Sequence, residues 1–161
     1  MSRTPDSGPS SLLLFRHSSR KVLRAPLRDF LSRTVARITP GRAVTCLITT
    51  DEELRKLNWR FRHKNYPTDV LSFPASTQSG ELGEMAISFD RASEQAARQG
   101  HGVDEELRIL ILHGVLHLQG MDHESDSGEM ARAERSWRKR LGLPIGLIER
   151  SRPALREGKP A

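Results

Sequence analysis

Cysteine is almost absent from this chain of 161 residues, which contains only Cys46. A single cysteine cannot form an intramolecular disulfide, so small disulfide-stabilised secreted domains are excluded and a reducing compartment is expected. No apolar run is long enough to cross a bilayer, and the first ten residues lack the apolar stretch of a secretory signal peptide. We therefore expect a cytoplasmic protein that does not associate with membranes.

Acidic residues are scarce in the first third of the chain. Residues 1–50 contain nine Lys and Arg residues but only two Asp and Glu residues, and the net charge of the whole chain is +6. A basic excess of this kind favours polyanionic partners such as RNA or DNA. The alternative is that the charge serves solubility alone.

Internal repeats and a second hydrophobic core are also lacking, so a single domain is expected at this length. Apolar periodicity and turn residues predict nine elements in the order βαβαββααα. Strands are expected at residues 12–16, 43–49, 70–73 and 84–88, and helices at residues 26–38, 51–64, 89–99, 104–118 and 127–141. This order predicts an α+β fold with a small mixed four-stranded sheet and about five helices. We expect a disordered extension at residues 1–10, the domain at residues 11–148 and a loose tail at residues 149–161.

Several helix starts have their own signals. Thr50 and Glu53 form a predicted capping box, as do Asp126 and Glu129, and Ser88 or Asp90 is expected to cap the third helix. Apolar residues surround the fourth helix on nearly all sides between residues 107 and 118, which predicts that it is buried.

A cluster of histidines marks the end of this buried helix. Three of the six histidines, His113, His117 and His123, lie within eleven residues in the order H-x3-H-x5-H. The first two are i and i+4 on a helix and share one face, and Gly120 can end the helix so that His123 returns beside them. Three neutral imidazoles with an open fourth position are typical of a catalytic zinc site. The alternative, that each is a satisfied core histidine, does not explain why three lie together.

The same spacing tests for a peptidase. Metzincin peptidases have the frame H-E-x-x-H-x-x-G-x-x-H, and His113, His117, Gly120 and His123 match it. The position of the general-base glutamate is occupied by Gly114, so peptide hydrolysis lacks its usual proton acceptor. A metal-dependent peptidase that uses a distant carboxylate is the remaining form of this alternative.

A phosphodiester substrate fits the sequence better. Its transition state requires positive charge on the phosphoryl oxygens. Arg60, Arg62, His63 and Lys64 precede the segment Pro67-Thr-Asp-Val-Leu-Ser-Phe-Pro74 and could supply this charge. The alternative for each of them is a solvated helix end.

Three blocks of sequence resemble the YbeY family of bacterial single-strand endoribonucleases. They are His113-Gly-x-Leu-His117-Leu-x-Gly120-x-Asp122-His123, then Asn58-x-x-Phe61-Arg62 with Pro67-Thr-Asp-Val-Leu-Ser-Phe-Pro74, and Leu82-Gly-Glu-Met-Ala-Ile-Ser88. The resemblance covers roughly residues 44–141 and agrees with the α+β order of elements. The chain departs from the usual family residues at Asn65, Glu84, Gln119 and Met121, none of which is an expected metal ligand.

The resemblance implies a function. Members of the family bind zinc through the three motif histidines, which implies one Zn²⁺ per chain at His113, His117 and His123, and their functional arginine corresponds to Arg62. They cleave single-stranded RNA, mature ribosomal RNA at the 3′ end of the small-subunit rRNA, and act in ribosome quality control. Their partners are small-subunit ribosomal proteins and a ribosome-assembly GTPase.

The combined hypothesis assigns a role to each candidate residue. Arg62 stabilises phosphate charge, whereas Arg60, His63 and Lys64 guide the RNA backbone. Asp122 and Glu84 are expected to orient the ligand histidines, with a simple turn as the alternative role of Asp122. A non-catalytic ribosome-assembly factor, in which the metal only stabilises the fold, is the alternative function.

Overall fold

A four-stranded sheet forms the centre of the protein. The computed structural model describes residues 10–19, 21–75 and 80–151. The strands are β1 (Leu12–Phe15), β2 (Ala43–Thr49), β3 (Val70–Pro74) and β4 (Glu81–Ser88), in the spatial order β1-β2-β4-β3. β1 and β4 both run parallel to β2, and β3 runs antiparallel to β4. The predicted mixed sheet is therefore confirmed, although β4 begins three residues earlier than expected.

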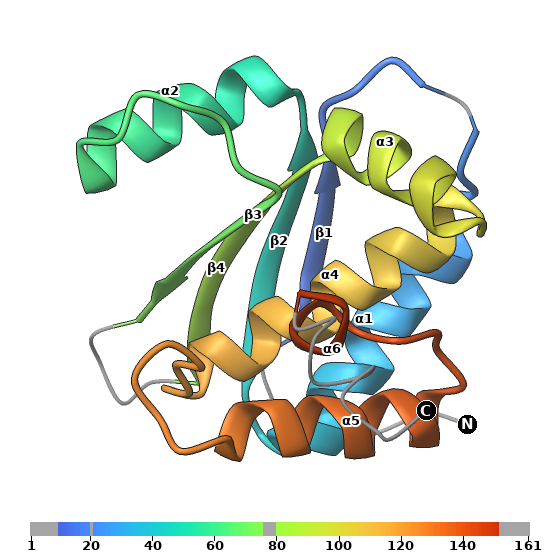
Figure 1. The fold of residues 1–161 in the computed structure, drawn as a ribbon, viewed down its shortest axis with the longest axis vertical. Helices are drawn as coiled ribbons and strands as arrows, with labels where there is room; N and C mark the ends of the chain where they lie inside the picture. The colour runs from blue at the N-terminus through green and yellow to red at the C-terminus, as the bar shows by residue number, and fades with distance from the viewer. Residues whose placement is uncertain (1–9, 20, 76–79, 152–161) are drawn as a thin grey trace, which may run out of the picture.

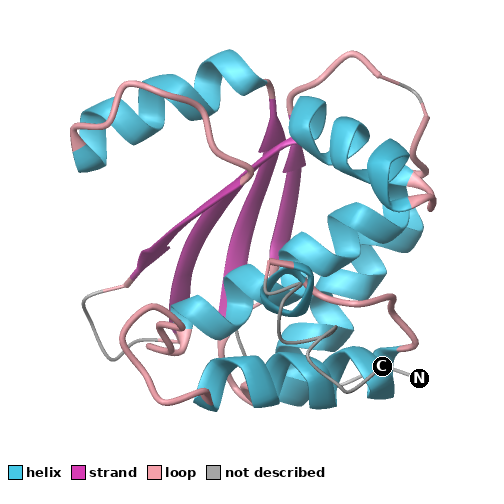
Figure 2. Cartoon of the chain, in the orientation of Figure 1, coloured by secondary structure: helices cyan, strands magenta, loops and turns pink. Residues whose placement is uncertain are grey.

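Six helices surround the sheet (Figure 2). They are α1 (Arg24–Ile38), α2 (Asp51–Arg62), α3 (Phe89–Gln99), α4 (Val103–Leu118), α5 (Glu129–Leu141) and α6 (Leu147–Arg150). The single-domain α+β prediction is confirmed, and the short helix α6 is the one element that was not expected. None of the described helices combines the length and the apolar character needed to cross a membrane.

The two faces of the sheet are covered unequally. Figure 1 shows α2 on one side and α1, α4 and α5 on the other. Because side chains alternate along a strand, Leu13, Cys46 and Met85 face the larger group of helices and belong to the main core. Leu71 and Ala86 face the opposite way and pack with Leu54 of α2 in a smaller cluster. His113 and His117 lie on the main-core side, near the C-terminal end of α4.

Helix α4 passes through the main core, as its apolar composition predicts. Eleven of its residues are buried, and these include Glu106 and His113. It begins at Val103, where the Glu105 carboxylate accepts a hydrogen bond of 3.1 Å from the Gly102 N–H. A helix packed on all sides has little freedom to move, so it provides a rigid base for the histidines near its end.

The predicted caps are only partly correct. Thr50 and Ser88 are the N-cap residues of α2 and α3, and each side chain accepts a backbone N–H bond. Glu53 does not complete the expected box at Thr50; its carboxylate instead accepts a 2.7 Å bond from the Thr49 hydroxyl. At α5 the N-cap residue is Gly128 rather than Asp126. Asp126 nevertheless accepts the N–H of Met130, because the loop brings its carboxylate to the helix end.

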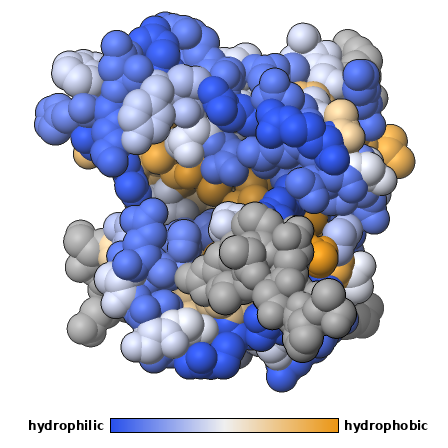
Figure 3. Space-filling model, in the orientation of Figure 1, coloured by the Kyte–Doolittle hydropathy of each residue, from blue (hydrophilic) through white to orange (hydrophobic). Residues whose placement is uncertain are grey.

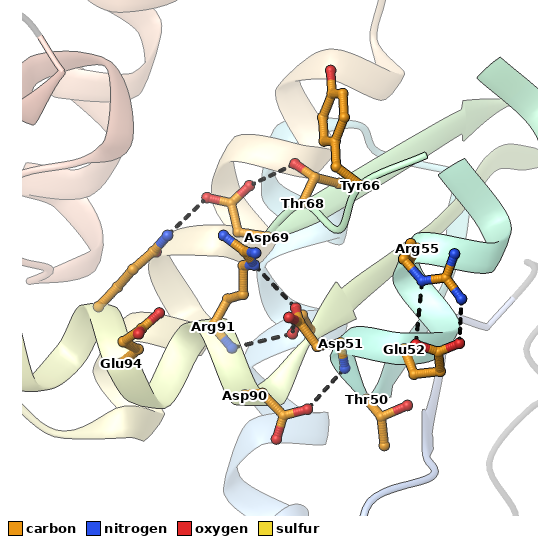
Figure 4. Close-up of polar contacts among 12 residues, drawn as sticks. Thr50, Asp51, Glu52, Arg55, Tyr66, Thr68, Asp69, Asp90, Arg91 and Glu94 are labelled. Carbon is orange, nitrogen blue, oxygen red and sulfur yellow. Dashed lines mark hydrogen bonds and ion pairs between the residues drawn. The ribbon is translucent and has the colours of Figure 1, made fainter. Parts of the chain in front are cut away.

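A polar network joins the starts of α2 and α3 (Figure 4). The Asp51 N–H donates to the Asp90 carboxylate at 2.8 Å, and the Asp51 carboxylate accepts from Ser88 Oγ at 2.9 Å and from Arg91 Nε at 3.0 Å. These bonds fix the beginning of α2 to the C-terminal end of β4 and the start of α3. Together with the packing of Leu54 on the sheet, they anchor the helix that ends at Arg62.

The C-terminal segment is ordered further than expected. Glu149 and Arg150 were assigned to a loose tail, but both are helical, with Glu149 bound to Arg138 at 2.9 Å. Arg150 forms two bonds of 3.1 and 3.2 Å to Glu106, a buried carboxylate on α4. Residues 1–9 of the expected extension and residues 152–161 of the expected tail lie outside the described residues.

Candidate metal centre

The three motif histidines converge at the end of α4. One nitrogen of each of His113, His117 and His123 lies within 4.8 Å of the other two. His113 and His117 are separated by one helical turn, with ring centroids 4.7 Å apart. The helix ends at Leu118, and Gly120 then adopts φ +99°, a left-handed conformation that brings His123 back to the pair. Three imidazoles at this separation can hold a metal ion.

Two of the rings are held by hydrogen bonds at Nδ1. His113 Nδ1 lies 2.8 Å from the Glu134 carboxylate, and His117 Nδ1 lies 2.9 Å from the carbonyl oxygen of Met121. Both partners are acceptors, so each Nδ1 carries the proton and each Nε2 keeps its lone pair for a metal. The arrangement matches the way metal-binding histidines are usually oriented in proteins.

Glu134 is the principal site residue that the sequence did not reveal. It comes from α5, is only 1% exposed, and uses its second oxygen to accept the Ile148 N–H at 2.9 Å. A signal was present, because Glu134 falls on the apolar stripe formed by Met130 and Trp137 at spacings of four and three. A carboxylate on a buried stripe requires a polar partner, and here that partner is a candidate metal ligand.

The protonation state of His117 also suits a metal. Burial lowers the pKa of His117, and the neighbouring charge of His113 lowers it further. The neutral imidazole is therefore favoured at neutral pH. Only the neutral ring can donate its lone pair to a metal. Because His117 is mostly neutral, few protons have to be released from it when a metal binds.

Gly114 lies in close contact with the side chain of Met85. A Cβ atom at this position would lie 2.6 Å from Met85 Sδ and 3.5 Å from Ser72 Oγ. The helix therefore touches the sheet where metzincins have their catalytic glutamate. A glutamate at this position would have to displace the Met85 side chain.

The histidines face an open pocket of about 570 Å³, which we call the metal pocket. Its other walls come from the end of α2, the segment before β3 and β3 itself, and include Arg62, Thr68, Asp69 and Ser72. Figure 3 shows the molecule hollowed between α2, above, and the segment that follows α4, below. Arg62 and the histidines are about fifty residues apart in the sequence, and the fold brings them to one cavity.

Asp69 is a second residue that was not singled out from the sequence. Its carboxylate accepts bonds from the Val70 N–H at 2.8 Å, from Gln95 Nε2 at 3.3 Å and from Thr68 Oγ1 at 3.4 Å (Figure 4). It lines the metal pocket beside His113. These bonds hold a negative charge in place at the wall of the cavity.

Other predicted site residues lie elsewhere. Arg60, His63 and Lys64 are exposed and do not line the metal pocket in the described part of the chain. Glu84 does not orient a histidine: it alternates with Met85 along β4, so it points to the opposite face of the sheet and lines a separate groove there.

Asp122 takes its alternative role as a turn residue. Its carboxylate accepts bonds of 3.1 Å from the Glu124 N–H and from Ser125 Oγ, and these bonds keep its pKa below the usual range. The partner that orients His117 is instead the Met121 carbonyl oxygen. The turn after α4 places this backbone oxygen 2.9 Å from His117 Nδ1.

Comparison with known proteins agrees with this geometry. The family model described as Endoribonuclease YbeY matches residues 16–142, most of the chain. The chain belongs to the YbeY family. The Endoribonuclease YbeY of Solibacter usitatus is 48% identical over 144 residues, covering 89% of this chain and 97% of that protein. The one of Koribacter versatilis is 49% identical over 149 residues, with 92% and 97% covered.

A solved structure extends the similarity to the fold. The solution structure of TM1509 from Thermotoga maritima superposes with a TM-score of 0.55 at 27% identity, covering 78% of this chain and 86% of that one. The YbeY resemblance seen in the sequence is therefore confirmed over nearly the whole domain. The range matched by the family model contains all three histidines, Arg62 and Glu134.

Proposed function

We propose that this YbeY-family protein is a zinc-dependent endoribonuclease that cleaves single-stranded RNA. The observation that carries the proposal is the shared pocket, in which Arg62 and the cluster of three histidines line one cavity. A cationic fork beside a metal centre is suited to phosphodiesters, because both place positive charge where a phosphoryl group develops negative charge. The printed name of the relatives, Endoribonuclease YbeY, supports the same reaction.

Each group of site residues has a separate role in the proposed reaction. His113, His117 and His123 hold one Zn²⁺, which supplies Lewis-acid polarisation of a phosphoryl oxygen when bound. Glu134 and the Met121 carbonyl keep two of the imidazoles in the orientation and tautomer that binding requires. Arg62 binds the scissile phosphate through its planar guanidinium, which matches two phosphate oxygens at once.

The proposed biological role follows the family. The protein acts in the cytoplasm on ribosomal RNA, at the 3′ end of the small-subunit rRNA, and in ribosome quality control. Its partners in this role are small-subunit ribosomal proteins and a ribosome-assembly GTPase. The basic charge of the chain, +6 in total, supports an RNA partner.

The test combines metal analysis with mapping of RNA ends. We expect the purified protein to contain one zinc per chain and to cleave single-stranded RNA internally. The double variant His113→Ala/His117→Ala is expected to lose both the metal and the cleavage while it remains folded. Mapped product ends would identify the nucleophile, because a 2′,3′-cyclic phosphate indicates attack by the RNA 2′-hydroxyl.

The alternatives give different outcomes in the same assay. Unchanged RNA cleavage by the folded double variant would disprove metal-dependent catalysis. Unfolding on metal removal, without any cleavage by the metal-loaded protein, would indicate an assembly factor with a structural metal. Zinc-dependent hydrolysis of unstructured protein, with none of RNA, would indicate a peptidase, although the crowding at Gly114 opposes that outcome.

A further inference from the structure

The last turn of α2 exposes an aromatic surface that the metal site does not use. Trp59 is 55% exposed, although tryptophan normally contributes a large apolar area to packing. Its indole packs edge-to-face against the imidazole of His63, with ring centroids 5.6 Å apart and an interplanar angle of 85°. Figure 1 shows this end of α2 projecting at the edge of the molecule. More than half of Trp59 is therefore accessible to a partner despite the contact with His63.

The backbone at His63 is unusual. With φ +59°, His63 is the one non-glycine residue at positive φ in the part of the chain that the structure describes. It occupies the C-cap of α2, where glycine is favoured because a side chain in this conformation is strained. A residue kept in such a conformation points to a use for its side chain, and here the ring is placed beside Trp59.

The surroundings carry unbalanced positive charge. Arg60, Arg62 and Lys64 form no ion pair with any residue that the structure describes. Trp59 and Arg62 are i and i+3, so they lie on the same side of the helix. Arg62 also lines the metal pocket, so the side of α2 that carries Trp59 includes one residue of that pocket.

We propose that Trp59 and His63 form a base-stacking site for single-stranded RNA, next to the nucleotide whose phosphate lies at the metal centre. This inference rests on the proposed function and specifies how its substrate is held. One base stacks on the exposed indole face while Arg60 and Lys64 neutralise the flanking phosphates. An open aromatic ring surrounded by cations is the combination with which proteins bind unpaired nucleotides.

The site also selects for unpaired RNA. In a duplex both faces of every internal base are already covered by neighbouring base pairs, so no base can stack on Trp59 without being displaced. A base in single-stranded RNA loses much less stacking energy when it moves onto Trp59. The stacking site therefore provides a physical reason for single-strand preference that does not depend on the cleavage chemistry.

The fluorescence of Trp59 provides a direct test. The chain has two tryptophans, so the Trp137→Phe variant keeps only Trp59. We expect a single-stranded 2′-O-methyl oligoribonucleotide, recovered intact afterwards, to quench this fluorescence. The same strand in a duplex, and an abasic strand with the same phosphates, should quench it far less, because stacking requires a free base.

Binding variants separate stacking from charge. Trp59→Ala is expected to weaken binding of the single-stranded probe by roughly 5- to 100-fold, as for the loss of one stacked base. Trp59→Phe should recover most of the affinity. Phe61→Ala is the matched control, because Phe61 is 56% exposed on the same turn but packs with Phe73 toward the other face; it should bind normally.

Clear outcomes would overturn the stacking site. They are normal probe binding by Trp59→Ala, an equal loss in Phe61→Ala, or equal quenching by the abasic strand. Binding of a protein partner at Trp59 without RNA quenching would also overturn it. Failure of the proposed function looks different: base-dependent quenching would persist, while unmodified RNA would remain uncleaved by the zinc-loaded protein.

Discussion

His113 Nδ1 lies 2.8 Å from the Glu134 carboxylate, and both residues are buried. The pair joins α4 to α5 across 21 residues of sequence. Glu134 must also accept the Ile148 N–H, so its two oxygens serve two donors at once. Only a carboxylate can accept both bonds, because the amide of glutamine offers one acceptor oxygen and one donor group.

Glu134→Gln is therefore expected to weaken zinc binding by about 10- to 100-fold, since one of the two donors loses its acceptor. Chelator competition with the purified protein measures the affinity. Glu94→Gln, an exposed carboxylate on α3, is the control and should bind zinc normally. Equal affinity in the Glu134 variant and the wild type would show that this contact does not orient the ligand.

Gly114→Ala is expected to destabilise the fold by about 1–3 kcal/mol, the usual effect of overpacking. The added Cβ would lie 2.6 Å from Sδ and 3.2 Å from Cε of the buried Met85, so this side chain has to shift. Urea unfolding measures the loss. The double variant Gly114→Ala/Met85→Ala should be more stable than the two separate effects predict, by about 0.5–3 kcal/mol; simple additivity would argue against the contact.

Arg62→Ala is expected to lower the turnover number for RNA cleavage by roughly 10²- to 10³-fold, the range for loss of one group that stabilises transition-state charge. Arg62→Lys should recover only part of this rate, because an ammonium lacks the planar fork. Arg98→Lys is the matched control, since Arg98 is an exposed arginine of α3 that pairs with Glu94 and does not line the metal pocket. Full activity of Arg62→Lys would exclude bidentate phosphate binding.

Arg150→Met tests whether α6 belongs to the folded domain. The change removes the bidentate cation of the buried Glu106 carboxylate, which then keeps only the 2.7 Å bond to His101 Nε2. Removing one member of a buried pair costs up to about 3–5 kcal/mol. Arg135→Met removes an exposed partner of Glu149 and should cost at most about 1 kcal/mol. Similar unfolding midpoints for the two variants would contradict the buried role of Arg150.

Cys46 is expected to resist thiol reagents at pH 8 in the folded protein. Burial in the main core raises the pKa of its thiol to about 12, so the reactive thiolate is scarce. In the unfolded chain the thiol ionises near pH 8.5. The neutral thiol of Cys46 therefore contributes its full stability to the folded state below about pH 8.5. This contribution is lost as the pH rises toward 12, because ionisation of the thiol favours the unfolded state.

A colorimetric thiol assay with and without denaturant checks this prediction. Labelling should be fast in denaturant and slow in the native state. Rapid labelling of the native protein at pH 8 would mean that the strand β2 opens locally, since Cys46 has no exposed surface.

The sequence by itself determined the features that depend on neighbours along the chain. The i, i+4 spacing of His113 and His117 and the turn at Gly120 are local, so the convergence of the three histidines followed from helix geometry. The Thr50 cap and the burial of α4 are also local patterns and were confirmed. Order and spacing of the apolar segments were sufficient for the α+β fold with a mixed sheet.

Only the tertiary structure decided which distant groups meet. Glu134 joins His113 because α5 packs against α4, and Arg62 reaches the pocket because a network at Asp51 fixes the start of α2. Strand alternation turns Glu84 away from the histidines, and the turn after α4 presents the Met121 carbonyl instead of Asp122. These outcomes depend on packing between segments that are far apart in sequence, and no local pattern contains that information.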